Sequence, residues 1–240
     1  METQFFHFFL LFFIIYLFAY FRVFRNWPPK IRPEASSCLI SFFHGTPAVI
    51  LACIAILGDK SRGFSSANTK TQNLVLDFSI AYFITDLLHY LVFFPHDVLF
   101  IGHHLATLFV FVTCRYLVAH GAFAILGLLV LAEVTSACQN TWTLASARRH
   151  DVELADKIYR SLSPPFYAFY SVVRGVLGPL FVHEMCVSFI SGAADDVIPK
   201  WVWISWMVVI VSAISVSILW ISGLWVQFYR ERRALDKKTS

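Results

Sequence analysis

The stretch FFHFFLLFFIIYLFAYF, residues 5–21, decides the fold class of this chain, because it contains no Asp, Glu, Lys or Arg. Residues 38–57 share this property. A helix of about 20 apolar residues crosses the hydrocarbon core of a bilayer, which is about 30 Å thick. Both stretches therefore predict transmembrane helices.

The composition extends this prediction to the whole chain of 240 residues. Charged residues make up 14% of the chain and hydrophobic residues 58%, whereas a typical soluble domain has about 25% charged residues. The apolar residues form long unbroken blocks and do not alternate as they do in a transmembrane β-strand. The sequence thus predicts an all-α, polytopic membrane helix bundle.

Five further apolar blocks follow the first two. They lie at residues 74–94, 98–118, 121–142, 163–183 and 201–228. We therefore expect about seven transmembrane helices, within a range of six to eight. The first block has no basic segment before it and no small-residue cleavage site after it, which favours a retained helix over a cleaved signal peptide.

The basic residues predict the orientation of the bundle. With seven spans and a lumenal N-terminus, 13 of the 19 Lys and Arg residues fall in cytosolic segments. Four fall in lumenal segments, and three of these, Lys60, Arg62 and Lys70, oppose the prediction. Because cytosolic loops are enriched in Lys and Arg, we expect a lumenal N-terminus and a cytosolic C-terminus.

The last four residues are Lys237-Lys238-Thr239-Ser240. Two lysines at these positions of a cytosolic tail resemble the dilysine signal by which coat machinery retrieves proteins to the endoplasmic reticulum. We therefore expect a multi-pass protein of that membrane. A basic tail that attracts anionic headgroups, at about 1 kcal/mol per charge, is the alternative.

Polar residues within the spans are costly and therefore need a partner or a function. In the third block Tyr82, Asp86, His89 and Tyr90 share one helix face, which we expect to face the bundle interior. Asp77 lies nine residues before Asp86, about half a turn away around the helix. We expect Asp77 to contact water or to cap the helix near its lumenal end.

The adjacent pair His103-His104 opens the fourth block. A neutral imidazole can accept a proton from an amine or a hydroxyl near pH 7, and Asp86 on the neighbouring helix could orient it. The alternative is a pair of interfacial histidines bonded to backbone or water. Metal ligands on a helix usually lie at i and i+4, so the adjacent spacing predicts no metal.

Two other classes of partner are not expected. The five cysteines have neither zinc nor redox spacing and are interpreted as small buried residues. The net charge of +4 comes from residues that border the spans, and no nucleic-acid module is recognisable, so no nucleic-acid partner is predicted.

The acidic helix from Asp77 to Asp86, followed by His103-His104-Leu105-Ala106-Thr107, resembles the core motif of the TLC domain family. The resemblance covers about residues 38–228, with a first helix and basic loop at 1–37 and a basic tail at 229–240. It implies a lipid protein of the endoplasmic reticulum. The family's ceramide synthases join an acyl group from acyl-CoA to a sphingoid amine, and their adjacent histidines are essential.

The resemblance thus makes His103 and His104 catalytic candidates with Asp86 in support, acyl-CoA a co-substrate and membrane lipids the partners, with no further cofactor. Ceramide synthases continue with a Leu-His-Asp-x-Ser-Asp segment in the next helix. Here that segment reads Leu131-Ala132-Glu133-Val134-Thr135-Ser136, so the histidine and the second acid are missing. The run to Trp142 is more similar to the small TLC domain-containing proteins, which are associated with membrane lipid composition and trafficking.

Several functions therefore remain open. In an acyltransferase, His103 or His104 would act as general base or carry the acyl group, Asp86 would orient the imidazole and Tyr82 would donate a hydrogen bond. Glu133 is a further candidate, either catalytic or paired with Arg115, Arg174 or a histidine. Alternatively, the same polar pocket serves a non-enzymatic lipid-sensing, lipid-homeostasis or trafficking protein. In a cargo or chaperone-like role, the polar residues would only hold helices together.

Overall fold

The chain folds as a bundle of long helices. The structure is a computed structural model that describes the backbone of residues 2–239 and the side chains of residues 4–233. Within these residues the only β-contact is an isolated antiparallel bridge between Ala67 and His120. Seven helices are long and apolar enough to span a membrane, which confirms the predicted number. They are Gln4–Val23, Arg32–Leu57, Lys70–Phe93, Val98–Val118, Ala122–Arg148, Glu153–Ile190 and Lys200–Arg233.

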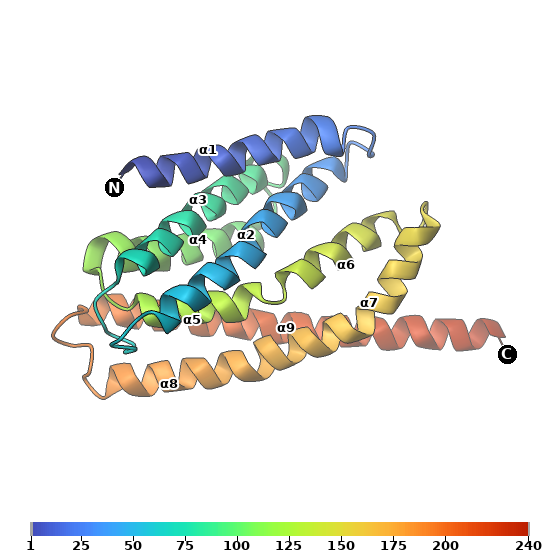
Figure 1. Cartoon of the computed structure of the whole chain (residues 1–240). Coiled ribbons are helices and arrows are strands. Elements are labelled where there is room, and N and C mark those ends of the chain that lie inside the picture. Colours follow the sequence, from blue (N-terminus) through green and yellow to red (C-terminus); the bar gives the residue numbers. More distant parts are fainter. Residues whose placement is uncertain (1, 240) are drawn as a thin grey trace.

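Several spans consist of more than one helical segment (Figure 1). The α-helices are α1 (Glu2–Phe18), α2 (Arg32–Leu57), α3 (Lys70–Phe93), α4 (Val98–Val112), α5 (Ala122–Glu133), α6 (Ser136–Arg148), α7 (Glu153–Val172), α8 (Gly178–Ile190) and α9 (Lys200–Thr239). The π-helical segments are η1 (Ala19–Val23), η2 (Thr113–Val118) and η3 (Val173–Leu177). The fifth span breaks at Val134-Thr135, between α5 and α6. The sixth changes pitch through η3, which ends next to Gly178-Pro179.

Local sequence explains where the two central spans begin. Thr69 and Gln72 form a reciprocal capping box at the start of α3, in which each side chain accepts a hydrogen bond from the other's backbone N–H. Asp97 caps α4 by accepting from the backbone N–H of Phe100. Short polar segments thus start both helices by satisfying backbone N–H groups of their first turns.

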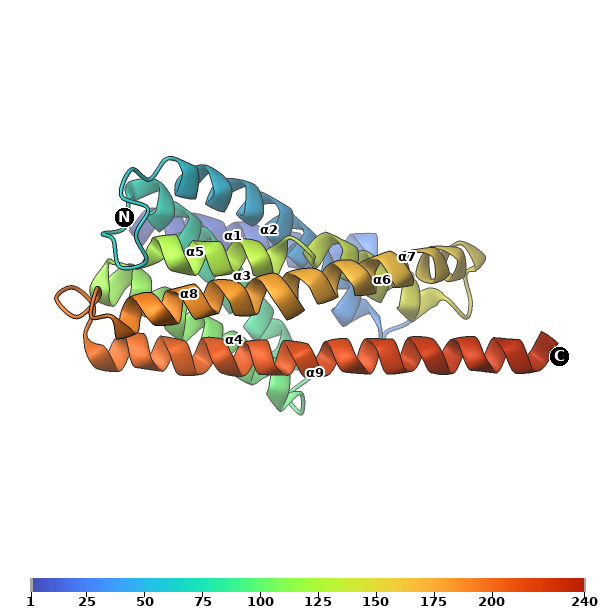
Figure 2. The same cartoon turned by 90° about the horizontal axis from the view of Figure 1, so that it is seen from below.

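Helix α3 lies at the centre of the bundle. In its span 72% of the residues of the most apolar window are buried, against 17% in the first and last spans. It packs against α1, α2, α4 and α5, while α9 runs along α4, α7 and α8 (Figures 1 and 2). The outer helices expose many large apolar side chains, among them Ile50, Leu180 and Leu219. This distribution suits a protein whose outer surface meets lipid tails.

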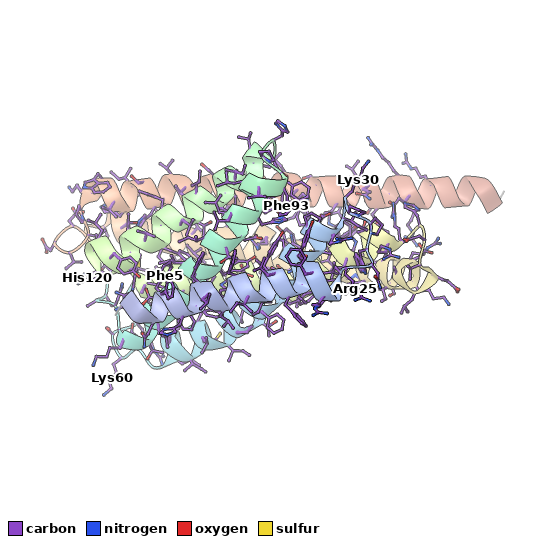
Figure 3. The ribbon with its side chains drawn as sticks, turned by 90° about the horizontal axis from the view of Figure 1, so that it is seen from above. Phe5, Arg25, Lys30, Lys60, Phe93 and His120 are labelled. Atoms are coloured by element: carbon purple, nitrogen blue, oxygen red, sulfur yellow. The ribbon has the colours of Figure 1, made fainter. Side chains whose placement is uncertain are left out.

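The bundle has two ends that differ in charge. Lys60 and His120 lie at the end where the chain begins, which we term the Lys60 end (Figure 3). Arg25 and Lys30 lie toward the opposite end, which we term the Arg25 end and toward which α9 extends. The α6–α7 turn, with Arg148 and Arg149 beside it, also lies at the Arg25 end. Basic residues therefore accumulate at one end of the bundle.

Candidate functional site

Asp86 joins three helices near the middle of the bundle. Asp86 lies on α3 and is only 4% exposed. One carboxylate oxygen lies 2.9 Å from Nε2 of His104 on α4, and the other accepts a hydrogen bond of 2.6 Å from the hydroxyl of Ser37 on α2. The predicted neighbourhood of Asp86 and His104 is confirmed, whereas Ser37 was not singled out from the sequence.

Both ring nitrogens of His104 are engaged. Nδ1 lies 2.8 Å from the backbone carbonyl oxygen of Phe100, one helical turn earlier. Because a carbonyl oxygen only accepts hydrogen bonds, Nδ1 must carry a hydrogen. A second proton then sits between Nε2 and Asp86, as either an imidazolium–carboxylate or an imidazole–carboxylic acid pair. His104 is held in one orientation and has no nitrogen free for a substrate.

His103 differs from His104 in its exposure and in its hydrogen bonding. Its side chain is exposed, and none of the described residues forms a hydrogen bond with its ring. The two imidazole rings meet edge to face, with 5.6 Å between their centroids. Because its nitrogens are accessible, His103 is the member of the pair that could exchange a proton with a bound molecule.

The face of α3 that carries Asp86 is buried, as predicted. Tyr82, Asp86 and His89 are each no more than 5% exposed, and Tyr90 is half-buried. Tyr82 lies flat against the ring of His44 on α2, with 4.0 Å between the ring centroids and an interplanar angle of 4°. Its role as a hydrogen-bond donor to substrate stays a prediction.

His44 is a site residue that the sequence interpretation missed. It is fully buried, and its Nε2 lies 3.1 Å from the hydroxyl of Ser79. Its Nδ1 lies 3.9 Å from a carboxylate oxygen of Glu133. The second span is predicted from its lack of Asp, Glu, Lys and Arg, a criterion that does not include histidine. A histidine within an apolar span is itself a costly residue and could have been flagged on that ground.

Glu133 and Arg174 both lie near the break between α5 and α6. The guanidinium of Arg174, on η3, donates to the backbone carbonyl of Ala132 and lies over the ring of Tyr170. It also interacts electrostatically with Glu133 and with His103. Arg174 and a histidine, two of the three expected partners of Glu133, are thus its neighbours, and Arg115 is not among them.

Asp77 corrects an expectation. The sequence predicts that Asp77 contacts water or caps α3, and this is wrong: Asp77 is 2% exposed and lies within the helix. Nε and a terminal nitrogen of Arg115 donate to its two oxygens at 2.9 and 3.0 Å, and the hydroxyl of Tyr116 donates at 2.7 Å. The cause is the packing of η2 beside α3, which brings Arg115 to Asp77 instead of to Glu133.

A mostly apolar cleft of about 490 Å³ opens between α1 and α3, beside the face that carries Asp86. At its wall the hydroxyl of Tyr16 and Nδ1 of His89 lie 2.8 Å apart in a hydrogen bond. Leu17, Leu88 and Phe93 supply apolar lining. The volume of the cleft lies within the range of small-ligand sites.

Two further expectations concern metals and the tail. Across the part of the chain that the structure describes, no three His, Cys, Asp or Glu side chains come together as metal ligands do. The five cysteines are free thiols. Lys237 and Lys238 lie outside the residues whose side chains are described, so the tail signal stays a prediction.

Comparison with known proteins identifies the family. The TLC domain model matches residues 34–226, which is most of the chain. A TLC domain-containing protein of Arabidopsis thaliana is 66% identical over 237 residues, which cover 96% of this chain and 93% of that relative. No solved structure matches the chain. The chain belongs to the TLC domain family.

Proposed function

We propose that this membrane protein acts in lipid metabolism by transferring an acyl group from acyl-CoA to a sphingoid or other lipid acceptor. The observation that carries the proposal is the buried Asp86–His104 pair beside the exposed imidazole of His103. A locked acid–histidine pair next to an accessible base is an arrangement suited to proton transfer. Membership of the TLC domain family supports the lipid-related part of the proposal.

In this mechanism His103 takes the proton of the acceptor's amine or hydroxyl while that group attacks the thioester carbonyl carbon. A carbon–nitrogen or carbon–oxygen bond forms, the carbon–sulfur bond breaks, and the departing thiolate receives the proton from His103. Asp86 holds the ring of His104, and His104 packs against His103. Asp86 and His104 therefore position the base and do not themselves touch the acceptor.

A second candidate is a non-enzymatic lipid-sensing or lipid-homeostasis protein. Two observations favour it: both nitrogens of His104 are occupied within the protein, and Ala132 stands where ceramide synthases have a histidine. In this case the cleft between α1 and α3 and the polar residues beside it bind a lipid without turnover.

We also propose that the protein resides in the endoplasmic reticulum membrane, with the Lys60 end lumenal and the Arg25 end cytosolic. The accumulation of basic residues at the Arg25 end supports this orientation. A cytosolic tail would present Lys237 and Lys238 to coat machinery.

The activity is tested with purified protein in lipid nanodiscs, given labelled acyl-CoA and a panel of long-chain amines and lyso-lipids. We expect a labelled lipid product from the wild-type protein and none from His103→Asn. His183→Asn is the matched control, since His183 is 70% exposed on α8 and lies outside the site. Ligand retention without turnover across the panel would favour the lipid-sensing function instead.

The location is tested separately. Changing Lys237 and Lys238 to Ser should release part of the protein from the endoplasmic reticulum to the Golgi. A tag on the tail should be digested by protease added to intact microsomes. Protection of that tag would contradict both the orientation and the retrieval signal.

A further inference from the structure

Four buried polar atoms without a hydrogen-bond partner gather around the break between α5 and α6. They are Nδ1 of His44, Oε2 of Glu133, Oγ1 of Thr135 and Nε of Arg174. The described side chains contain seven such atoms in all, so more than half of them lie at this one place. Buried polar atoms are nearly always paired, because an unpaired one loses its bonds to water and gains nothing in return.

Bulk water cannot satisfy these unpaired atoms, because they are buried within the membrane-spanning part of the bundle. His44 is fully buried, and the side chain of Glu133 is only 11% exposed. All four atoms belong to predicted spans, which are surrounded by lipid tails that form no hydrogen bonds. A hydrogen-bonding partner supplied from outside the chain would satisfy them.

Gly45 makes the position of Glu133 possible. A β-carbon at residue 45 would lie 2.9 Å from Oε2 of Glu133 and about as close to the side chain of Ser136. Any larger residue would therefore displace the carboxylate. The lack of a side chain on α2 thus lets the carboxylate lie directly against that helix, within 3.9 Å of His44.

The chemistry of the four atoms defines what they can bind. Nε of Arg174 can only donate a hydrogen bond and the carboxylate of Glu133 can only accept one, whereas the Thr135 hydroxyl can do both. The charges balance: Glu133 is matched by Arg174, and the Asp86–His104 pair has no net charge in either protonation form. A charged headgroup would leave one charge unmatched in a medium of low dielectric constant.

We propose that His44, Glu133, Thr135 and Arg174 form a binding site for an uncharged lipid head that carries a hydroxyl or amide N–H beside a carbonyl oxygen. The carbonyl accepts from Arg174 and the hydroxyl or N–H donates to Glu133. One part of this proposal rests on the proposed function: the bound lipid would be the acceptor or the product of the reaction next to His103. Selective binding itself does not require catalysis.

The test compares three single-chain lipids that differ in head charge: a monoacylglycerol, a lysophosphatidic acid and a long-chain primary amine. Each is titrated without acyl-CoA into the full-length protein in phosphatidylcholine nanodiscs. Wild-type protein should bind the monoacylglycerol at least about tenfold more tightly than either charged lipid, as expected for one charge-assisted hydrogen bond. Equal affinity for all three lipids would overturn the proposal.

Two substitutions change the net charge of the site in opposite directions: Arg174→Gln removes a positive charge and Glu133→Gln removes a negative one. Arg174→Gln should weaken monoacylglycerol binding about tenfold and shift the preference toward the amine, whereas Glu133→Gln should shift it toward lysophosphatidic acid. Arg174→Lys keeps the charge but lacks Nε, so it should also lose affinity while the protein stays folded. Unchanged binding in Arg174→Gln and Arg174→Lys would mean that water alone satisfies these atoms, and would overturn the proposal.

Gly45→Ala is a test by displacement, and Gly223→Ala on α9 is its control, because a β-carbon at residue 223 meets nothing within 4 Å. Only Gly45→Ala should weaken monoacylglycerol binding, and equal binding by both variants would contradict the inference.

His103→Asn separates the binding-site proposal from the acyltransferase proposal. If that variant binds the monoacylglycerol normally and wild-type protein shows no acyl transfer, the site stands and the acyltransferase proposal fails.

Discussion

Helix α3 carries two acids that each face a basic side chain from the fourth span, and the two pairs differ in how completely they are bonded. Asp77 receives three hydrogen bonds, two from Arg115 and one from Tyr116. Asp86 is bound by His104 and Ser37, next to the exposed His103. Arginine keeps its charge at all physiological pH values, whereas histidine can release a proton. The first pair is therefore suited to holding helices together, and the second to orienting the neighbouring imidazole of His103, which is the accessible base.

The largest effect on stability is expected at the first pair. Asp77→Asn leaves Arg115 charged and buried without its anion, which should lower the free energy of unfolding by about 3–5 kcal/mol. The double variant Asp77→Asn/Arg115→Met should recover much of this loss, because it removes the unmatched charge as well. Thermal unfolding in detergent measures both. A single variant as stable as wild type would show that the pair is not structural.

A smaller loss of stability is expected at the second pair. In Asp86→Asn the amide can still bond to Ser37 and His104, and His104 can remain neutral, so the cost should be about 1–2 kcal/mol. Acyl transfer should nevertheless fall by about 100-fold or more, since the amide carries no negative charge to balance the positive charge that develops on the histidines as the proton moves. Parallel unfolding and transfer assays check this. A loss of stability as large as that of Asp77→Asn would remove the contrast between the pairs.

His44 should matter to the second region without holding the bundle together. His44→Phe keeps a flat ring against Tyr82 but removes the contacts with Ser79 and Glu133. The free energy of unfolding should fall by only about 1 kcal/mol, because the buried Ser79 hydroxyl loses its partner while the unpaired nitrogen of His44 disappears. Lipid binding in nanodiscs should weaken. Unfolding of this variant at the temperature that unfolds Asp77→Asn would assign His44 a structural role instead.

The smallest effect is expected at Asp59, an acid outside both pairs, in the turn before α3. Burial raises its pKa, but hydrogen bonds from Ser61 and Gln72 outweigh this and hold the pKa below its ordinary value. A lowered pKa contributes stability above the ordinary value of about 4 that is lost as pH falls through the folded-state pKa. Asp59→Asn should therefore flatten the decline of the unfolding temperature below about pH 4. An unchanged pH profile would show that these hydrogen bonds do not favour the ionised form.

The sequence predicts the spans better than it predicts the contacts between them. All seven spans were found because length and composition alone decide whether a helix can cross a bilayer. The pairing of Asp86 with His104 followed from one helix face and the neighbouring turn. The partner of Asp77 did not follow, because it depends on how η2 packs beside α3.

The other site residues that the sequence does not predict are distant in sequence from the motif. His44 and Ser37 lie on α2, and Arg174 lies on η3, far from the motif of the third and fourth spans. Only the packing of α2 against α3 and α5, and of η3 against α5, brings them to the site. Helical periodicity reports which residues share one face of one helix, but it carries no information about which faces of different helices meet.

The most direct test of the account is the lipid profile of cells that lack this protein and are rescued with His103→Asn at a folded protein level equal to wild type. His103 has accessible nitrogens and no hydrogen bond to any described residue, so its substitution should leave the unfolding temperature unchanged. We predict that wild-type protein restores the lipid profile and that His103→Asn does not. Full restoration by His103→Asn would contradict the proton-transfer site and leave both histidines with a structural role.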